Sequence, residues 1–175
     1  MSSQVATGKL SYVKVLPYRQ LSIASSGDIL VKGETLFKGY VAGTRLELPL
    51  TSDGWFKTGD LGALNSQGCL TVLGRKDNMF VSGGENIQPE EIEKVLMAIE
   101  GVEQAIVVPK EDKEFGHRPV AFVKFCGTAI DFKQLSAILE KDLPRFKVPE
   151  NFYPWPTAVE KGMKIARLVI RGHIP

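Results

Sequence analysis

The stretch that most constrains this chain is residues 74–93, which read GRKDNMFVSGGENIQPEEIE. A short apolar run ends at Gly74, a basic pair and Asp77 follow, and a second apolar run leads into Ser82-Gly83-Gly84. After Pro89 the apolar residues take on helical spacing. The stretch therefore predicts a strand, a pivot, a second strand, a glycine loop and a helix in quick succession.

The chain before this stretch alternates short apolar runs with turn-forming residues, a pattern typical of antiparallel strands. Residues 20–24 and 29–32 predict one hairpin, and residues 61–64 and 69–73 predict a second. Residues 51–62, TSDGWFKTGDLG, are rich in turn formers, and we expect turns there, with Asp53-Gly54 as a tight-turn pair. No helix is expected in this part of the chain.

The chain after residue 88 predicts alternating helix and strand. Pro89 suits the first position of a helix, and Gly101 suits its end. Between them runs an apolar stripe of Ile92, Val95, Leu96 and Ile99. The further elements expected are a strand at 102–108 stopped by Pro109, a charged loop at 110–118, a strand at 119–125, a helix at 130–139, a short strand near 152–153 and a last helix beginning at 165–170.

Composition excludes several classes of protein. The 175 residues are 43% hydrophobic and 24% charged, with a net charge of +2, so nothing calls for nucleic acid or an anionic membrane as a partner. No segment approaches the roughly 20 apolar residues of a membrane span. The N-terminus MSSQVATG lacks the basic start and apolar core of a signal peptide. We expect a cytoplasmic protein.

Cysteine and histidine content predicts no metal site. The two cysteines, Cys69 and Cys126, lie far apart in apolar runs, which favours two buried free thiols in a reducing compartment. The two histidines, His117 and His173, are too few for a zinc site.

Three charged residues have positions that suit chemistry, and each has a plainer reading. Asp60 follows Gly59 beside aromatic residues, but a turn aspartate usually bonds only to nearby backbone. Arg75 follows Gly74 directly, but could belong to a solvated charge cluster. Lys164 lies just before an apolar run, but could be an ordinary surface lysine.

The Ser82-Gly83-Gly84 triplet also has two readings. It could cradle a phosphate, although its spacing fits neither a P-loop nor a dinucleotide fingerprint. Alternatively, the missing side chains let a slender ligand pass or let two domains touch. The charged residues 110–118 could likewise form a solvated face or a basic contact for a phosphorylated ligand.

Taken together, four blocks resemble the adenylate-forming superfamily of acyl-CoA synthetases, peptide-synthetase adenylation domains and luciferases. In order they are GDILVKGETLFKGY at 27–40, DGWFKTGDLG at 53–62, GRKDNMFVSGGENIQPEEIE at 74–93 and GMKIAR at 162–167. Within the superfamily, DKEFGHRPVAF at 112–122 and the variant DNMFVSGGENIQPEE are most similar to the 2-succinylbenzoate–CoA ligase family of menaquinone biosynthesis.

The resemblance implies an α+β fold in two parts. Residues 1–75 would be a β-rich, barrel-like and mostly antiparallel piece of the large domain. Residues 76–175 would be the small, mobile α/β C-terminal domain, with its hinge at Asp77. The resemblance covers nearly the whole chain, but the chain corresponds to only the last third or so of the family's sequences.

The resemblance also implies two half-reactions with ATP (with Mg²⁺) and CoA as co-substrates, and no tightly bound cofactor. A small-molecule carboxylate attacks the α-phosphate of ATP, and CoA then displaces AMP. Asp60 and Arg75 would hold the ribose hydroxyls, and Lys164 would bridge carboxylate and phosphate oxygens. The small domain would then rotate about Asp77, so that Ser82, Gly83 and Gly84 line the tunnel for the pantetheine of CoA.

Two positions depart from the family pattern. Val81 stands where many relatives carry lysine, so any role for a charge is absent there. The last block reads Gly162-Met163-Lys164, one residue longer than the Thr-Gly-Lys of many relatives. We align the catalytic lysine with Lys164, because Ile165 and Arg167 keep their places after it, and Lys161 is the fallback.

The phosphate loop and the aromatic-Gly-x-Thr-Glu block of the family are missing from the sequence. Met1 therefore resembles an internal methionine, and we expect a fragment that is inactive by itself and self-associates through exposed large-domain surface. Two alternatives stay open. The acid could be a fatty or aryl carboxylate, or the chain could be a non-catalytic remnant that binds a partner.

Overall fold

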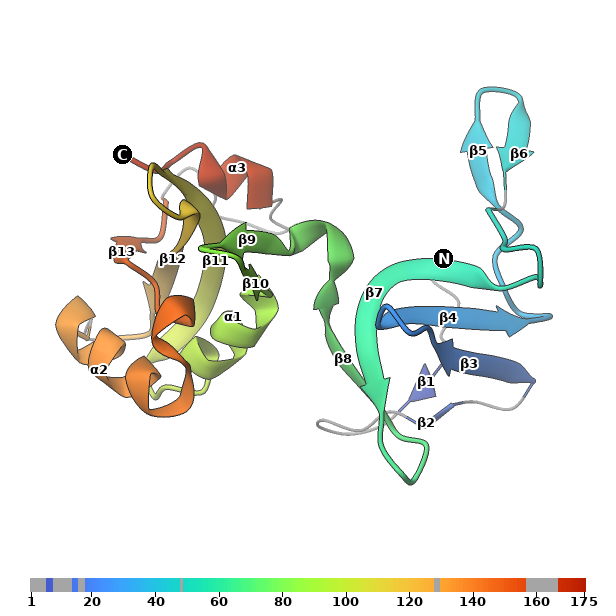
Figure 1. The fold of residues 1–175 in the computed structure, drawn as a ribbon, viewed down its shortest axis with the longest axis horizontal. Helices are drawn as coiled ribbons and strands as arrows, with labels where there is room; N and C mark the ends of the chain where they lie inside the picture. The colour runs from blue at the N-terminus through green and yellow to red at the C-terminus, as the bar shows by residue number, and fades with distance from the viewer. Residues whose placement is uncertain (1–5, 8–13, 16–17, 48, 128–129, 157–166) are drawn as a thin grey trace. The chain divides into compact units, whose positions relative to one another are not determined.

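The computed structural model describes residues 6–7, 14–15, 18–47, 49–127, 130–156 and 167–175 (Figure 1). The chain divides into two compact units, Met1–Asp77 (unit 1) and Asn78–Pro175 (unit 2). Asp77, the predicted hinge, is the last residue of unit 1. Lys164 and its fallback Lys161 lie outside the described residues.

Unit 1 is built on an antiparallel sheet of strand order β3-β4-β7-β8. Its strands are β3 (Arg19–Ile23), β4 (Asp28–Gly33), β7 (Phe56–Leu64) and β8 (Leu70–Arg75). Two further pairs of short strands are β1 (Ala6–Thr7) with β2 (Lys14–Val15), and β5 (Tyr40–Ala42) with β6 (Arg45–Glu47). Both predicted hairpins are confirmed, as the β3–β4 and β7–β8 pairs.

The prediction of turns throughout residues 51–62 is wrong for its second half, which is the first part of the bent strand β7 (Figure 1). The side-chain hydroxyl of Thr58 donates to the carbonyl of Ile29 at 3.1 Å and accepts the backbone N–H of Asp60 at 3.0 Å. The register shifts between Leu61 and Gly62, where a Cβ on Gly62 would lie 2.7 Å from a methyl carbon of Ile29. The glycines therefore bend the strand without ending it.

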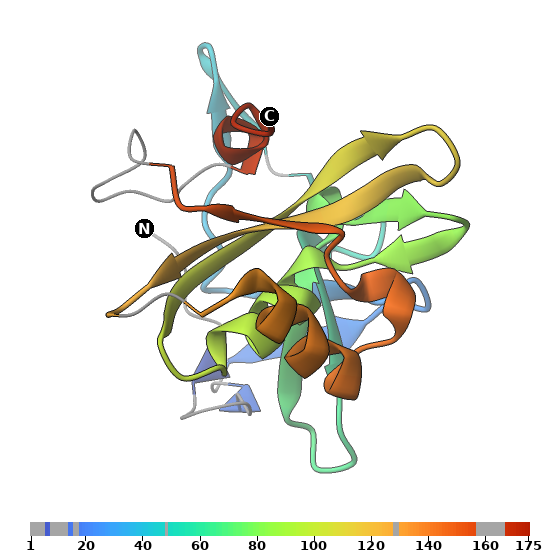
Figure 2. The same cartoon turned by 90° about the vertical axis from the view of Figure 1, so that its left-hand side faces the viewer.

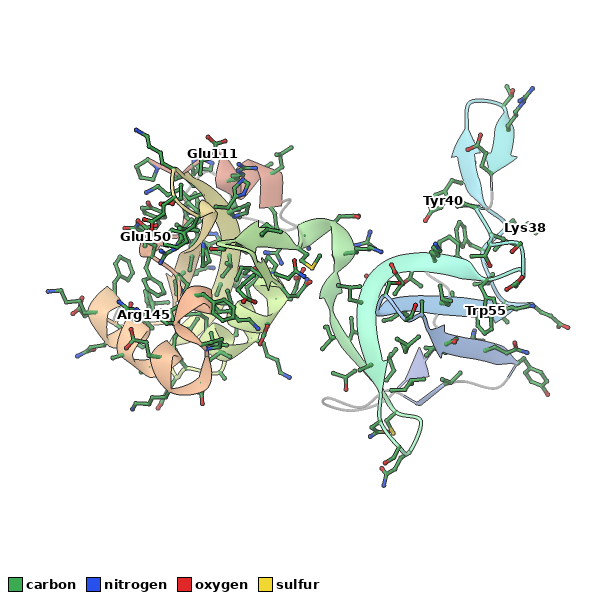
Figure 3. The ribbon with its side chains drawn as sticks, viewed as in Figure 1. Lys38, Tyr40, Trp55, Glu111, Arg145 and Glu150 are labelled. Carbon is green, nitrogen blue, oxygen red and sulfur yellow. The ribbon has the colours of Figure 1, made fainter. Side chains whose placement is uncertain are left out.

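The core of unit 1 is small, and much apolar surface remains exposed. Its buried side chains are Ile29, Val31, Phe56 and Leu70. Exposed large apolar residues include Tyr18, Tyr40, Val41, Val72 and Leu73. Figure 3 shows Tyr40, Lys38 and Trp55 at the end of the sheet from which the β5–β6 hairpin departs.

Unit 2 begins with a hairpin that the sequence only half predicted. Strands β9 (Phe80–Ser82) and β10 (Glu85–Ile87) pair so that Ser82 faces Glu85 across a two-residue loop. Both loop residues are left-handed, with φ of +58° at Gly83 and +87° at Gly84, as such tight hairpin loops require. The sequence predicted a loop leading straight to the helix and missed β10. Helix α1 (Pro89–Met97) then starts at Pro89 as predicted, but it ends at Met97 rather than at Gly101.

The centre of unit 2 is a sheet of strand order β11-β12-β13, in which β13 runs parallel to β12. The strands are β11 (Val102–Asp112), β12 (Gly116–Phe125) and β13 (Asn151–Pro154). Helices α1 and α2 (Phe132–Asp142) cover one face, where Val107, Ala121 and Val123 join the core. Helix α3 (Arg167–Arg171) covers the other face, with Ile170 buried against Val108, Val120 and Phe122 (Figure 2).

The predicted stop at Pro109 and the charged loop at 110–118 are both wrong. β11 runs on to Asp112 and β12 starts at Gly116, so that Pro109 faces Pro119 across the ladder. The carbonyl of Pro119 accepts the N–H of Glu150 on the β13 side. The missing N–H of Pro119 therefore points away from β11, and the ladder loses no hydrogen bond at this pair.

The expectation of two buried thiols is also wrong. Cys126 is exposed and Cys69 is only partly buried, and both are free. Within the described residues no helix is long and apolar enough to cross a membrane.

Candidate functional site

Asp60 and Arg75, selected separately from the sequence, face each other on neighbouring strands. Asp60 of β7 is the register partner of Arg75 of β8. A guanidinium nitrogen (Nη1) of Arg75 lies 3.2 Å from Asp60 Oδ1 and donates to the carbonyl of Thr58 at 2.8 Å. Both side chains remain well exposed, at 46% for Arg75 and 36% for Asp60. The sheet therefore presents a paired carboxylate and guanidinium to solvent.

Gly59 makes room for this arrangement. Its φ is +75°, and a Cβ there would lie 2.8 Å from Arg75 Nη2. A side chain at this position would push the guanidinium away from Asp60. The close approach of the Arg75 guanidinium therefore explains the glycine at position 59 without a turn.

Arg75 also contacts the predicted hinge residue. Its Nη2 donates to Asp77 Oδ2 at 3.0 Å, and Asp77 is 77% exposed. The hydrogen bond to Asp77, followed by that to Asp60, raises the pKa of Arg75 above its usual value. Arg75 is therefore a permanent cation held between two carboxylates.

Lys76 is anchored by a buried carboxylate of unit 1. Its ammonium donates to both oxygens of Asp28, at 3.0 and 2.8 Å, and Ser26 donates to Asp28 at 2.5 Å. Asp28 is only 5% exposed. The hydrogen bonds from Lys76 and Ser26 lower the pKa of Asp28, so the carboxylate stays ionised and the pair is maintained at neutral pH.

Asn78, on the other side of Asp77, is anchored to helix α1 of unit 2. Its side-chain amide donates to Glu90 Oε1. Burial alone would raise the pKa of Glu90, but hydrogen bonds from Asn78 and Gln88 and the charge of Arg167 outweigh it and lower that pKa. Asp77 is therefore the one residue between an anchor in unit 1 and an anchor in unit 2. The two anchored residues, Lys76 and Asn78, are the first and last residues of the 3₁₀ turn η1 (Lys76–Asn78).

The predicted glycine loop borders a cavity of about 440 Å³ in unit 2. The cavity is lined by Ser82, Gly83, Glu85, Phe115, Arg118, Arg145 and Phe146. These residues come from the β9–β10 turn, the β11–β12 hairpin and the 3₁₀ turn η2 (Arg145–Lys147), which lie along one edge of unit 2 (Figure 2). Figure 3 shows Arg145 on this last turn, after α2.

The cavity combines aromatic rings with basic groups. The guanidinium of Arg118 lies 4.9 Å from the centroid of the Phe115 ring, a cation–π contact. The Nε of Arg118 is buried and has no hydrogen-bond partner in the described part of the chain. Two guanidinium groups beside apolar rings suit a ligand that carries both phosphate and apolar parts.

Most of this cavity is not predicted from the sequence. The sequence predicts a possible basic contact at residues 110–118, but it places Arg145 and Phe146 only near a connector. The usable signal was the pairing of an aromatic residue with a nearby arginine, which recurs as Phe115 with Arg118 and as Arg145 with Phe146.

A buried ion pair of Glu93 and Arg167 is a further feature that the sequence did not predict. Arg167 of α3 binds both carboxylate oxygens of Glu93 on α1, contacts Glu90 at 2.9 Å and donates to the carbonyl of Val107 at 2.8 Å. Glu93 in turn accepts the N–H of Val107 at 2.7 Å. Burial alone would lower the pKa of Arg167, but the hydrogen bonds and charges of Glu93 and Glu90 raise it. The pair joins two helices and a strand.

Comparisons with known proteins show what most of the chain is similar to. Residues 91–161 match the family described as AMP-binding enzyme C-terminal domain. The 2-succinylbenzoate–CoA ligase of Haemophilus influenzae is 46% identical over 145 residues, 80% of this chain and 31% of the relative. The same enzyme of Salmonella typhimurium is 43% identical over 158 residues, 89% of this chain and 34% of the relative.

Solved structures extend the similarity to the fold of most of the chain. Wild-type MenE of E. coli with a bound analogue of OSB-AMS is 35% identical, with a TM-score of 0.79 over 94% of this chain and 36% of that one. The MenE of Bacillus subtilis in complex with the acyl-adenylate intermediate OSB-AMP is 33% identical, with a TM-score of 0.74 over 83% of this chain and 32% of that one. The chain is thus similar to the C-terminal portion of adenylate-forming acyl-CoA synthetases.

The resemblance and fold class predicted from the sequence are thereby confirmed. In the described residues unit 1 is built of strands, and unit 2 combines helices and strands. The chain spans about a third of the length of the curated relatives it matches, at 31% and 34%.

Proposed function

We propose that this chain is the C-terminal part of an ATP-dependent acid–CoA ligase that acts on 2-succinylbenzoate. The observation that carries the proposal is the facing pair of Asp60 and Arg75 in a chain that matches 2-succinylbenzoate–CoA ligases over most of its length. The substrates would be a small-molecule carboxylate, ATP and CoA. ATP would enter with magnesium, since the MenE of Bacillus subtilis is described in complex with ATP and magnesium ion.

In the first half-reaction the acid's carboxylate oxygen would bond to the α-phosphorus of ATP, and pyrophosphate would leave. Asp60 would accept hydrogen bonds from both ribose hydroxyls, and Arg75 would donate to the same ribose. The Asp60–Arg75 contact supports this assignment, because it holds both groups in place before the nucleotide arrives. Lys164 would stabilise the charge that builds on the carboxylate and phosphate oxygens.

In the second half-reaction the thiol sulfur of CoA would bond to the acyl carbon, AMP would leave, and the thiol proton would pass to solvent. We propose that unit 2 first rotates about Asp77, so that Ser82, Gly83 and Gly84 border the path of pantetheine. The adjoining cavity supports this assignment, because Arg118 and Arg145 suit the phosphates of CoA. A phosphate cradle at Gly83 itself is disfavoured, because its N–H already donates to the carbonyl of Phe115 at 3.0 Å.

A chimera tests the proposal. Residues 1–175 would replace the matching C-terminal third of the Haemophilus influenzae relative. We expect the chimera to form 2-succinylbenzoyl-CoA from 2-succinylbenzoate, ATP and CoA, and we expect neither the 175-residue chain nor the truncated relative to do so by itself. Thioester formation would be followed by liquid chromatography, and pyrophosphate release would report the first half-reaction separately.

Variants of the chimera identify the lysine and the acid. Lys164→Ala should lower pyrophosphate release by about a hundredfold or more, whereas Lys161→Ala should change it little. Fatty and aryl acids supplied in place of 2-succinylbenzoate decide between the proposed acid and its alternatives. A folded chimera that is inactive in both half-reactions would instead favour a non-catalytic, partner-binding module. Thioester synthesis by the truncated relative alone would favour the same alternative, because the C-terminal third would then not be needed for catalysis.

We propose further that the isolated chain self-associates through unit 1. Exposed apolar side chains there include Val41 at 79% and Val72 at 55%, which support an interaction surface. We expect size-exclusion chromatography with light scattering to give a mass above that of one chain, falling toward it for a Val41→Lys/Val72→Lys variant. A monomer for the unaltered chain at micromolar concentration would contradict this. A cytoplasmic location fits ATP and CoA as co-substrates.

A further inference from the structure

The turn of the β11–β12 hairpin is held by a single carboxylate. Asp112 Oδ1 accepts the backbone N–H of Glu114 at 2.9 Å and that of Phe115 at 2.8 Å. The same two hydrogen bonds, that from Phe115 first, lower the pKa of Asp112. The acceptor is therefore ionised at neutral pH, and it fixes the backbone on which the Phe115 side chain is mounted.

This turn is tied to the glycine loop through Phe115. The carbonyl of Phe115 accepts the N–H of Gly83 at 3.0 Å. A Cβ on Gly83 would lie 2.8 Å from a ring carbon of Phe115, so the ring lies directly against this glycine. The positions of the hairpin turn and of the glycine loop are thus coupled by one hydrogen bond and one ring contact.

Phe115 is also a wall of the cavity. It lines the cavity together with Gly83 and Arg118, and the Arg118 guanidinium lies over its ring. A shift of the Phe115 ring would therefore change the space beside Gly83 and the position of Arg118 together. Asp112, which accepts the backbone N–H of Phe115, is not itself among the cavity's lining residues.

We propose that Asp112 is a positioning residue for the CoA-dependent half-reaction, holding Phe115 against Gly83 so that the cavity keeps the shape that receives CoA. The CoA part of this inference rests on the proposed function. The positioning part rests on the contacts of Asp112, Phe115 and Gly83, and it is measured separately.

The test uses the ¹⁵N-labelled 175-residue chain and three variants. Asp112→Ala removes the acceptor, Asp112→Asn keeps an acceptor oxygen without the charge, and Glu114→Ala is the matched control in the same turn. Amide hydrogen exchange at Gly83 and a CoA titration, both followed by NMR, are the readouts. The melting temperature of each variant reports any general loss of structure.

For Asp112→Ala we expect Gly83 exchange to be faster, and the apparent Kd for CoA to be higher, each by about tenfold, since one or two hydrogen bonds are lost. Asp112→Asn and Glu114→Ala should both stay within about threefold of the unaltered chain. A melting temperature within about 3 °C for all variants would show that the effect is local.

Unchanged Gly83 exchange in Asp112→Ala would overturn the proposal. Equal increases of Gly83 exchange in Asp112→Asn and Asp112→Ala would also overturn it, because the acceptor oxygen would then not be what holds Phe115 in place. Absence of CoA binding by the unaltered chain would overturn only the CoA part of the inference, while the chimera still tests the proposed thioester chemistry. In that case Gly83 exchange still decides whether Asp112 positions Phe115.

Discussion

Replacement of Asp77 by proline is expected to separate the two half-reactions of the chimera. Pyrophosphate release should stay within a few-fold of the unaltered value, whereas thioester formation should fall on the order of a hundredfold. Asp77 lies in a 3₁₀ turn, whose φ near −60° proline can adopt, so the conformation seen here is tolerated. Rotation about that φ is what the proline ring removes.

The effect should be concentrated at Asp77 because both neighbours are anchored. Lys76 is bound to Asp28 of unit 1 and Asn78 to Glu90 of unit 2. A change of direction between the units would therefore have to be absorbed largely at Asp77, unless one anchor breaks.

Asp77→Ala is the matched control for this prediction. It removes the carboxylate that contacts Arg75 but leaves the backbone free to rotate. We expect both of its half-reactions to stay within a few-fold of the unaltered chimera, since the lost ion pair is an exposed one. Equal losses in Asp77→Ala and Asp77→Pro would assign the effect to the side chain and contradict a pivot. Single-turnover assays with preformed acyl-adenylate would measure the second step directly.

The sequence predicted the elements whose formation depends on residues close together in the chain, namely helix α1 and two hairpins. Helix α1 has a proline at its first position and an apolar stripe facing the core, and these alone are sufficient to place it. The β3–β4 and β7–β8 hairpins have turn residues between apolar runs. The sequence singles out Asp60 and Arg75 separately. That they face each other depends on the register of β7 and β8, which neither strand determines alone.

The errors in the bounds of β7 and β11 share one cause, which is that glycines and prolines do not always end a strand. In β7 the glycines bend a continuing strand, and in β11 Pro109 faces Pro119 where no N–H is needed. Whether such a residue ends a strand depends on its partner strand, and that partner is distant in sequence. The cavity was missed for the same reason, because three separate turns contribute to it.

The buried ion pair of Glu93 and Arg167 could have been suspected from the sequence. Glu93 directly follows Ile92 and lies three residues before Leu96, on the side of α1 that the apolar stripe buries. A charge there needs a partner. That partner is 74 residues away, so the sequence alone gave no means of choosing Arg167.

Replacing Glu93 by glutamine is expected to lower the free energy of unfolding of unit 2 by about 3 kcal/mol. The side chain of Glu93 is 8% exposed and that of Arg167 is 22% exposed, so the arginine would be left largely buried with one fewer anion. Breaking such a pair costs about 3–5 kcal/mol, and we expect the lower end because Glu90 still contacts Arg167 at 2.9 Å. This is a large part of the roughly 5–15 kcal/mol that stabilises a domain.

A second glutamate in the same unit provides the control. Glu103 pairs with Lys124 at 2.9 Å, but both are more exposed, at 44% and 35%, so Glu103→Gln should cost less than about 1 kcal/mol. Urea unfolding would be followed by Trp155 fluorescence in a Trp55→Phe background, because these are the chain's two tryptophans and Trp155 packs on the sheet of unit 2. If Glu93→Gln and Glu103→Gln shift the midpoint equally at unchanged slope, the Glu93–Arg167 pair does not join α1, α3 and β11 in the way the contacts indicate.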